Sequence, residues 1–367
     1  MPGINVLKNT VKSTVIKEMG EMGHEQIVFC YDKPTGLKAI IAIHNTTLGP
    51  ALGGTRIWNY ASEEEALQDA LRLSRGMTFK NAVSGLNLGG GKAVIIGDAN
   101  KIKSEAFFRR FGQFIDSLGG KYITAEDVNM TTQDIENIAR ETKYITGMPQ
   151  EKGGSGDPSP ITAYGVYMGM KAAAKHAFGS DSLAGKKIAI QGVGHVGSVL
   201  VDYLAKEKAK IYITDISREK LNTIARKTRA EIVSEEEIYT LDIDIYAPCA
   251  LGATINDETI NKLRCKVIAG AANNQLADEK KHGEILKEKG IVYAPDFVIN
   301  AGGVTNCYAE FTGKNDSAGV YSLTKNIYDT TLNILRKAEA EAITPHEAAL
   351  GIALKRISDA SKVKENY

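Results

Sequence analysis

Two lysines and one aspartate are the residues whose types and spacing could carry acid–base chemistry. Lys80 and Lys92 flank a segment that ends in successive glycines at 89–91, which we expect to form a tight turn that a substrate can approach closely. Two ammonium groups that come near each other in a partly buried cleft each lose affinity for a proton. One lysine could then exchange protons near neutral pH while the other binds a carboxylate.

Asp127 follows a strand-like segment at 121–124 and precedes a helix that we expect to begin near Thr131 or Thr132. Loops at strand ends often carry catalytic groups on a rigid scaffold. For any one of these three residues alone, a solvated lysine or a helix-start acid is the more common interpretation. Their occurrence together with a cofactor fingerprint favours the catalytic hypothesis.

That fingerprint is a GxGxxG motif that follows an aliphatic strand at 187–191. Gly192 would make the tight turn, Gly194 would let the backbone approach a pyrophosphate, and Gly197 would pack the helix against the strand. The phosphates would then lie on free N–H groups at the positive end of a helix. The predicted cofactor-binding residues here are Gly192, Val193, Gly194, His195, Val196, Gly197 and Ser198.

The next strand, at 211–214, ends in Asp215, where an acid would bind the ribose 2′-OH. A carboxylate repels a 2′-phosphate, so the predicted cofactor is NAD. Arg218 and Lys220 lie nearby and leave NADP as the alternative.

The elements that position these residues follow from the hydrophobic pattern. Ser62 is a candidate helix N-cap with Glu65 at the capping-box position, and a strand at 93–96 follows the glycines. Glycines and prolines between about 147 and 160 predict a hinge or linker. Helix and strand alternate beyond it, and further helices are expected at 104–118, 163–178, 323–336 and 345–357.

Composition excludes several classes. The 45 basic and 44 acidic residues give a net charge of +1, which offers no hint of nucleic-acid binding. The four widely spaced cysteines predict neither a disulfide framework nor a metal site, but reduced thiols of a cytoplasmic protein. We find no signal peptide, lipid anchor or apolar run of membrane-spanning length.

Longer motifs give the chain a family resemblance. It is similar to the glutamate/leucine/phenylalanine/valine dehydrogenase family and, within it, to the branch that acts on leucine. The matching motifs run from about Gly23 to the last helix and are PALGGTR at 50–56, MTFK at 77–80, LNLGGGK at 86–92, YITAED at 122–127, GDPSPITAYG at 156–165, APCALGA at 247–253, NNQL at 273–276 and NAGGV at 300–304.

The resemblance implies roles for individual residues. Lys80 matches the lysine that binds the substrate α-carboxylate, Lys92 the lysine that activates a water, and Asp127 the general acid/base. Asn274 matches an asparagine near the carboxylate and the nicotinamide, and Thr162 a threonine near the carboxamide.

The resemblance also implies a side-chain pocket that is apolar or nearly so. Glutamate dehydrogenases have a lysine where this chain has Leu52, and burying an unpaired carboxylate there would cost several kcal/mol. A branched-chain substrate is therefore expected over glutamate, and phenylalanine is less favoured. Cys307 stands where we expect a valine, and leucine, isoleucine and valine remain undistinguished. The pocket residues are Leu52, Gly53, Ala125, Val304 and Cys307.

The expected architecture is an α/β fold with two domains separated by a cleft. A catalytic and oligomerisation domain is expected at 1–147, with about 340–367 returning to it, and a Rossmann NAD-binding domain at 148–339. The expected reaction is the NAD-dependent reversible oxidative deamination of L-leucine and other branched-chain L-amino acids to 2-oxo acids and ammonia, in a homo-oligomer that the resemblance makes an octamer. A glutamate dehydrogenase is disfavoured by Leu52, and a non-catalytic dinucleotide-binding scaffold by the presence of both lysines and Asp127.

Overall fold

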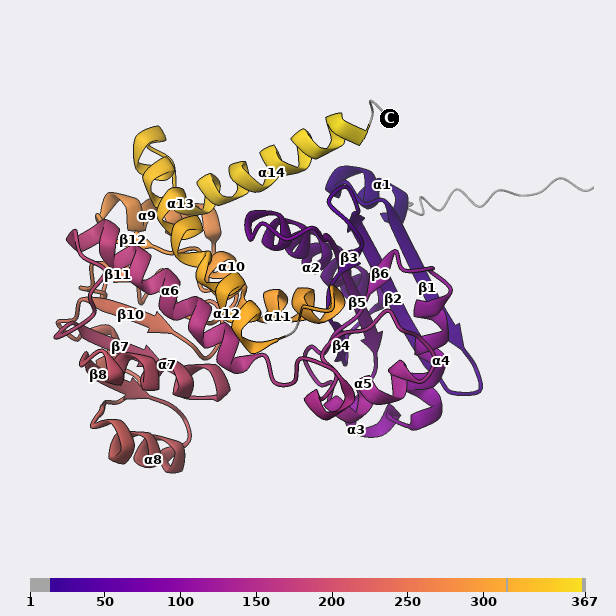
Figure 1. The fold of residues 1–367 in the computed structure, drawn as a ribbon, viewed down its shortest axis with the longest axis horizontal. Coiled ribbons are helices and arrows are strands. Elements are labelled where there is room, and N and C mark those ends of the chain that lie inside the picture. The colour runs from indigo at the N-terminus through magenta and orange to yellow at the C-terminus, as the bar shows by residue number, and fades with distance from the viewer. Residues whose placement is uncertain (1–13, 315, 365–367) are drawn as a thin grey trace, which may run out of the picture.

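The computed structural model describes residues 14–314 and 316–364. The first predicted domain was expected to include residues 1–13 and 365–367, which lie outside the described residues. The chain forms two α/β domains, each built on a six-stranded sheet (Figure 1). The short helix α1 (Thr14–Met22) precedes the first sheet. None of the described helices combines the length and apolar character that crossing a bilayer requires.

The first sheet is mixed, with the order β1-β2-β5-β3-β6 and β4 paired to β5. Residues of β2 alternate between its two buried faces: Ile40 and Ala42 pack under α2 (Glu63–Val83), while Ile41 and Ile43 pack under α4 (Glu105–Asp116) and α5 (Thr132–Ala139). The strands are β1 (Gln26–Asp32), β2 (Leu37–Asn45), β3 (Ala51–Leu52), β4 (Thr55–Trp58), β5 (Gly89–Ile96) and β6 (Tyr122–Ile123).

The glycines at 89–91 correct one expectation, because they lie inside β5 and not in a turn before it. A Cβ on Gly89 would lie 1.9 Å from the carbonyl oxygen of Asn45, and one on Gly91 would lie 2.7 Å from the Tyr122 ring. Glycine in a strand marks such close approach of neighbouring groups. The consequence is that Lys92 projects from a rigid central strand.

Helix ends follow the sequence signals closely. Ser62 caps α2 by accepting from the Glu65 N–H at 3.1 Å, as predicted. The Glu65 carboxylate turns back to the N–H of Ala61 at 2.7 Å, one residue earlier than a capping box requires. Ser104 and Thr131 cap α4 and α5 in the same way.

The second sheet is parallel, with the order β12-β11-β10-β7-β8-β9. This order runs in both directions from β7, which is the doubly wound arrangement that binds ligands where the strand order reverses. Its strands are β7 (Lys187–Gln191), β8 (Lys210–Thr214), β9 (Glu231–Ile232), β10 (Ile245–Pro248), β11 (Val267–Ile268) and β12 (Val292–Tyr293), and the helices around it are α6 (Ser159–Phe178), α7 (His195–Lys206), α8 (Arg218–Thr228) and α9 (Glu279–Glu288).

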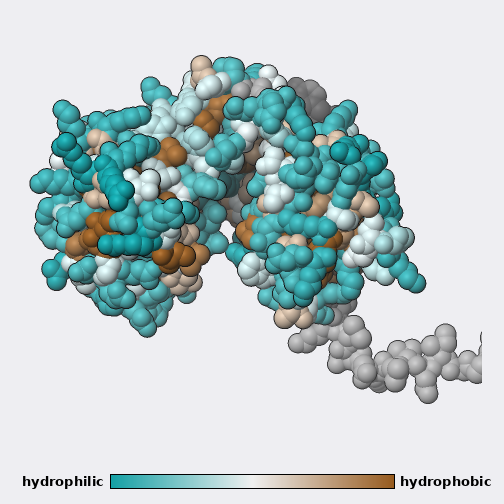
Figure 2. All heavy atoms as spheres, turned by 90° about the horizontal axis from the view of Figure 1, so that it is seen from below, coloured by the Kyte–Doolittle hydropathy of each residue, from teal (hydrophilic) through white to brown (hydrophobic). Residues whose placement is uncertain are grey.

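Late helices lie between the two sheets, and the surface is hollowed between the domains (Figures 1 and 2). The segment 147–158 joins the domains through a single 3-10 turn, η1 (Gln150–Lys152), and α6 begins at Ser159, earlier than expected. The last helix, α14 (Pro345–Lys364), packs on α2, where the Arg356 guanidinium donates to the carbonyls of Ala82 and Leu86 at 2.9 and 2.7 Å. The other late helices are α10 (Asp296–Ile299), α11 (Gly302–Phe311), α12 (Ser317–Lys325) and α13 (Ile327–Glu341), and α3 (Ala99–Ile102) is a short turn in the first domain.

Candidate active site

An ion pair joins the buried Lys92 to the partly exposed Asp127. Lys92 is 6% exposed on β5, and its Nζ donates to Asp127 Oδ2 at 2.6 Å from the loop after β6. Arg56 Nε donates to the same oxygen at 3.0 Å. Gly54 makes room for the carboxylate, because a Cβ there would lie 2.9 Å from the Asp127 Cβ.

Burial and the neighbouring charges have opposite effects on the pKa values of Asp127 and Lys92. Burial would raise the pKa of Asp127, but the charges and hydrogen bonds of Lys92 and Arg56 outweigh it, and the pKa lies below its usual range. For Lys92 burial dominates, and its pKa is lowered although Asp127 opposes the change. A carboxylate that stays ionised beside a lysine that releases its proton more easily is suited to proton exchange.

Lys80 reaches the same site from the last turn of α2. Its Nζ donates to Asn300 Oδ1 at 2.6 Å, and the Asn300 amide donates to Asn273 Oδ1 at 2.7 Å. Burial lowers the pKa of Lys80 to about 8; the charge of Lys92 adds to this effect, and Asp296 and Asp127 oppose it. The pKa is therefore lowered at both lysines, in the predicted direction, with burial as the main cause. The other lysine adds to the effect at Lys80, whereas at Lys92 the repelling cation is Arg56.

The residues expected to line the side-chain pocket are apolar and largely buried. Leu52, at 2% exposed, and Val304, at 7%, belong to one hydrophobic cluster, against which Cys307 packs. Gly53 and Ala125 follow the paired strands β3 and β6, and a Cβ on Gly53 would overlap the carbonyl of Gly91. Burial raises the pKa of the Cys307 thiol to about 11, so it stays protonated and behaves as a small apolar group.

Thr162 lies in the first turn of α6, where its Oγ1 donates to the Pro158 carbonyl at 3.0 Å. A Cβ on Gly303 would lie 3.1 Å from this oxygen, so Thr162 adjoins the start of α11. Asn274 has a left-handed backbone, with φ of 51°, and its carbonyl accepts from the Ala253 N–H at 2.7 Å. It is the neighbouring Asn273, and not Asn274, that bonds Asn300.

The glycine fingerprint has the geometry of a dinucleotide site. Gly197 packs the helix tightly, because a Cβ there would lie 2.1 Å from the Gly192 carbonyl, whereas a Cβ on Gly194 would meet nothing within 4 Å. Gly194 precedes α7 without a side-chain cap, which leaves the N–H groups of the first turn, from His195, Val196 and Gly197, open to an anion. Ser198 turns its hydroxyl to the His195 carbonyl at 3.1 Å.

Asp215 stands at the end of β8 and fixes this loop. Its Oδ2 accepts from the Val193 N–H and its Oδ1 from the Ser217 N–H, each at 2.8 Å. These residues fit a dinucleotide: open space at Gly194, a free helix N-terminus and a carboxylate at the next strand end. Across the described residues, no group of three His, Cys, Asp or Glu side chains could bind a metal ion.

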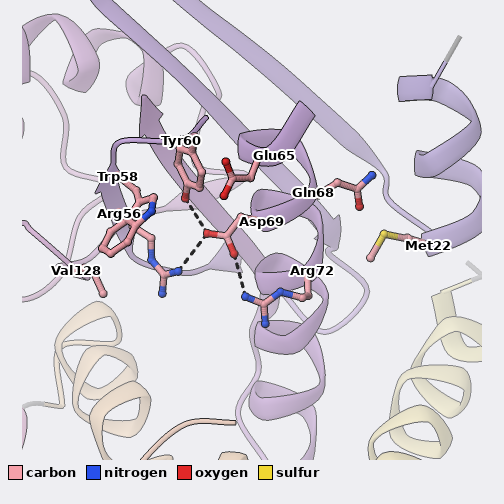
Figure 3. A pocket seen from close by; sticks show the side chains of 9 residues that line it. All are labelled: Met22, Arg56, Trp58, Tyr60, Glu65, Gln68, Asp69, Arg72 and Val128. Carbon is pink, nitrogen blue, oxygen red and sulfur yellow. Dashed lines mark hydrogen bonds and ion pairs between the residues drawn. The ribbon is translucent and has the colours of Figure 1, made fainter. Parts of the chain in front are cut away.

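The residues that the sequence analysis missed are Arg56, Asn300 and Asp296. Arg56 and Asn300 lie inside the recognised motifs PALGGTR and NAGGV, which was the signal available for them. Asp296 is 7% exposed, and its Oδ2 accepts from the Gln275 N–H at 3.2 Å. Beyond Arg56 lies a pocket of about 630 Å³ between β4 and α2 (Figure 3).

Comparisons with known proteins agree with this geometry. Residues 24–144 match the family model "Glu/Leu/Phe/Val dehydrogenase, dimerisation domain", and residues 153–217 and 212–364 match "Glutamate/Leucine/Phenylalanine/Valine dehydrogenase". The chain is 56% identical over 349 residues to the leucine dehydrogenase of Thermoactinomyces intermedius, covering 95% of each protein. It is 53% identical over 353 residues to the leucine dehydrogenase of Bacillus subtilis, covering 96% of each.

A solved structure of similar fold is that of L-tryptophan dehydrogenase from Nostoc punctiforme, with a TM-score of 0.85 and 46% identity over 94% of this chain and 99% of that one. Hetero-hexameric glutamate dehydrogenase from Thermus thermophilus has a TM-score of 0.77 over 93% of this chain and 90% of that one, and its 20% identity shows the fold alone. The chain therefore belongs to the glutamate/leucine/phenylalanine/valine dehydrogenase family, whose members use NAD(P).

Proposed function

We propose that the protein is an NAD-dependent amino-acid dehydrogenase that reversibly deaminates L-leucine and other branched-chain L-amino acids to 2-oxo acids and ammonia. The observation that carries this proposal is the Lys92–Asp127 pair, with Lys80 close by. The apolar character of Leu52, Val304 and Cys307, which belong to or pack against one hydrophobic cluster, supports a branched-chain substrate. Relatives that are 56% and 55% identical to this chain are leucine dehydrogenases.

Each polar residue has a task in this proposal. Lys80 binds the α-carboxylate, Lys92 orients and activates a water for attack on the imine carbon, and Asp127 exchanges protons with the amino group. The proximity of the three groups supports this division, as does a lowered pKa of both lysines. When it is bound, NAD accepts the hydride that leaves the amino-acid Cα.

The fingerprint residues of the second domain would bind the cofactor, with Asp215 on the adenosine ribose and Thr162 and Asn274 toward the nicotinamide end. The preference for NAD over NADP rests on the Asp215 carboxylate, which would repel a 2′-phosphate. We further propose the domain division at residue 147, with the C-terminal segment returning to the first domain, and a cytoplasmic homo-oligomer, an octamer by family resemblance. The packing of α14 on α2 supports the return of the C-terminal segment, and the four unpaired cysteines support a cytoplasmic location. The oligomer rests on the family resemblance alone.

Leu52 argues against glutamate as the substrate. It is fully buried beside other aliphatic groups, and a glutamate side chain would bring an unpaired carboxylate against them. The site also argues against a scaffold role, because a protein that only binds NAD has no use for a buried lysine–aspartate pair.

A substrate panel tests the proposal. Purified protein is mixed with NAD and L-leucine, L-valine, L-isoleucine, L-phenylalanine, L-tryptophan or L-glutamate, and NADH formation is followed by absorbance. The highest kcat/KM is expected for a branched-chain substrate, and the reverse reaction should consume NADH only with ammonia and the 2-oxo acid together. A preference for glutamate, or NADH binding without turnover of any amino acid, would refute the proposal.

A further inference from the structure

Arg56 makes the second cationic contact to the Asp127 carboxylate. Both Arg56 Nε and Lys92 Nζ donate to Oδ2, at 3.0 and 2.6 Å, and no described residue donates to Oδ1. One oxygen is therefore fixed from two directions, while the other is left for a substrate proton. Lys92 has a task in the proposed reaction, whereas Arg56 has none so far.

The other arm of the Arg56 guanidinium is anchored on α2. Arg56 Nη1 donates to Asp69 Oδ2 at 3.1 Å, and the Tyr60 hydroxyl donates to the same oxygen at 2.7 Å. Arg72 binds the second oxygen of Asp69 at 2.9 Å (Figure 3). Asp69 thus receives donors from β4, from the segment after it and from its own helix, so its carboxylate has little freedom to turn.

The planar guanidinium transmits this restraint. A fork of donors that binds two carboxylates at once fixes the direction between them, which a single ammonium group cannot do. Arg56 projects from β4, which is paired to β5, the strand that carries Lys92. The Arg56 side chain, which is only 23% exposed, therefore connects β4 and α2 to the Asp127 carboxylate.

We propose that Arg56, anchored by Asp69, is a positioning residue that holds Asp127 with Oδ2 bound and Oδ1 directed to the substrate amino group. The inference deepens the proposed function and rests on it. A permanent charge suits this task, because arginine keeps its proton throughout the pH range in which Lys92 can exchange one.

The pH dependence of Asp127 involves every charged or titratable group that acts on it, from each element packed around it. Removing Arg56 removes one of the two strongest cationic influences, so the pKa of Asp127 should rise. The groups are Lys92 on β5, Arg56 on β4, Lys80 on α2, Tyr60 after β4 and Tyr122 on β6.

The pocket beyond Arg56 allows the role of its guanidinium group to be tested by chemical rescue. It opens to solvent beside Arg56 and is lined by Trp58, Tyr60, Asp69 and Arg72 among others, so free guanidinium can reach the space that an Arg56→Ala variant vacates (Figure 3). A small cation that binds between Asp69 and Asp127 would replace the lost charge.

The experiment compares Arg56→Ala, Arg56→Lys and the matched control Arg140→Ala, whose side chain is 54% exposed and pairs with Glu105, outside the network of Arg56, Asp69 and Asp127. Arg56→Ala should lower kcat about 100-fold with unchanged NADH affinity, because a small misplacement of the base is costly. In the pH profile of kcat/KM for Arg56→Ala, the acid limb should move to higher pH by about one unit. Guanidinium chloride, well below its denaturing concentration, should restore activity to this variant, whereas sodium chloride should not. Arg56→Lys should keep the acid limb near its original position with a reduced kcat. Arg140→Ala should match the unmodified protein.

An Arg56→Ala variant that folds, binds NADH and keeps the original acid limb without a guanidinium response would overturn the inference. If Arg56→Ala does not fold, an Arg56→Lys variant with unchanged kcat would do so. A carbon-13 NMR titration of the Asp127 carboxyl, assigned with Asp127→Asn, separates this inference from the proposed function. It tests the effect of Arg56 on the pKa of Asp127 even if no amino acid is turned over.

Discussion

Lys80 on α2 and Asn300 at the end of α10 are joined by a 2.6 Å hydrogen bond between residues 220 positions apart. The bond connects a helix of the first domain to the segment that leads into α11, and Asn300 continues it to Asn273. The proposed carboxylate-binding lysine is thus in contact with both domains. A substrate carboxylate would have to share or replace this bond.

The affinity for a 2-oxo acid should weaken as pH rises through the pKa of Lys80, about 8. The charged Lys80 ammonium binds the carboxylate. The affinity is therefore highest below this pKa and falls about tenfold per pH unit above it. Calorimetric titration with the 2-oxo acid of leucine across this range measures the effect. Lys80→Arg, which keeps its charge, should remove the pH dependence, and a constant affinity in the unmodified protein past pH 8 would contradict the prediction.

Gly54→Ala should displace the Asp127 carboxylate. The added Cβ would lie 2.8 Å from the Glu126 carbonyl and 2.9 Å from the Asp127 Cβ, so the loop after β6 must shift. We expect kcat to fall about 100-fold, since catalytic geometry tolerates little displacement. Gly76→Ala on α2 is the matched control, because a Cβ there meets nothing within 4 Å and alanine favours a helix. Equal kcat in the two variants would count against this assignment.

The fold was predictable where local signals act alone. Ser62 caps α2 as predicted, α4 and α5 begin close to the predicted positions, and the sheet of the second domain begins where the fingerprint indicates. The glycines at 89–91 were misread as a turn, because the close neighbours that require them, such as Asn45 and Tyr122, come from other strands. The short strands β3, β4 and β9 carry too few residues for a pattern to show.

The site was predictable in its members but not in its connections. Lys80, Lys92 and Asp127 are recognisable from motifs, and the structure brings them close together. That Asn300 binds Lys80, or that Arg56 binds Asp127, depends on contacts between distant segments, which no local pattern reports. The dominance of burial over mutual repulsion in the pKa of Lys80 likewise depends on how deeply α2 is packed.

Asp215→Ala should weaken NADH binding about 10-fold or more, since it removes charged acceptors from the Val193 and Ser217 N–H groups as well as the proposed ribose contact. The loss for NADPH should be smaller, because the repulsion of its 2′-phosphate is also removed. Fluorescence titration with both nucleotides measures the two affinities. Asp202→Ala on α7, which breaks only an exposed ion pair with Lys227 on α8, serves as the control. Tighter binding of NADPH than NADH by the unmodified protein would reject the assignment of Asp215.

Glu310→Ala should loosen the segment between the domains. The Glu310 carboxylate accepts from the N–H groups of Gly147, Met148 and Ser155 and from the Ser155 hydroxyl, at 2.5 to 3.2 Å. Loss of this acceptor should lower the free energy of unfolding by about 1–3 kcal/mol and speed deuterium exchange at 147–156. Glu339→Ala, with a side chain that is 75% exposed, should change neither quantity. Unchanged exchange in Glu310→Ala would show that other contacts fix the segment.

The most direct test of the central claim is the kcat of an Asp127→Asn variant measured beside its affinity for NADH. The substitution keeps the size of the side chain but removes the group that exchanges protons and pairs with Lys92 at 2.6 Å. We predict that kcat for L-leucine falls by about 10²- to 10⁴-fold while the NADH dissociation constant is nearly unchanged. Turnover close to that of the unmodified protein would contradict the assignment of Asp127 as the acid/base of this site.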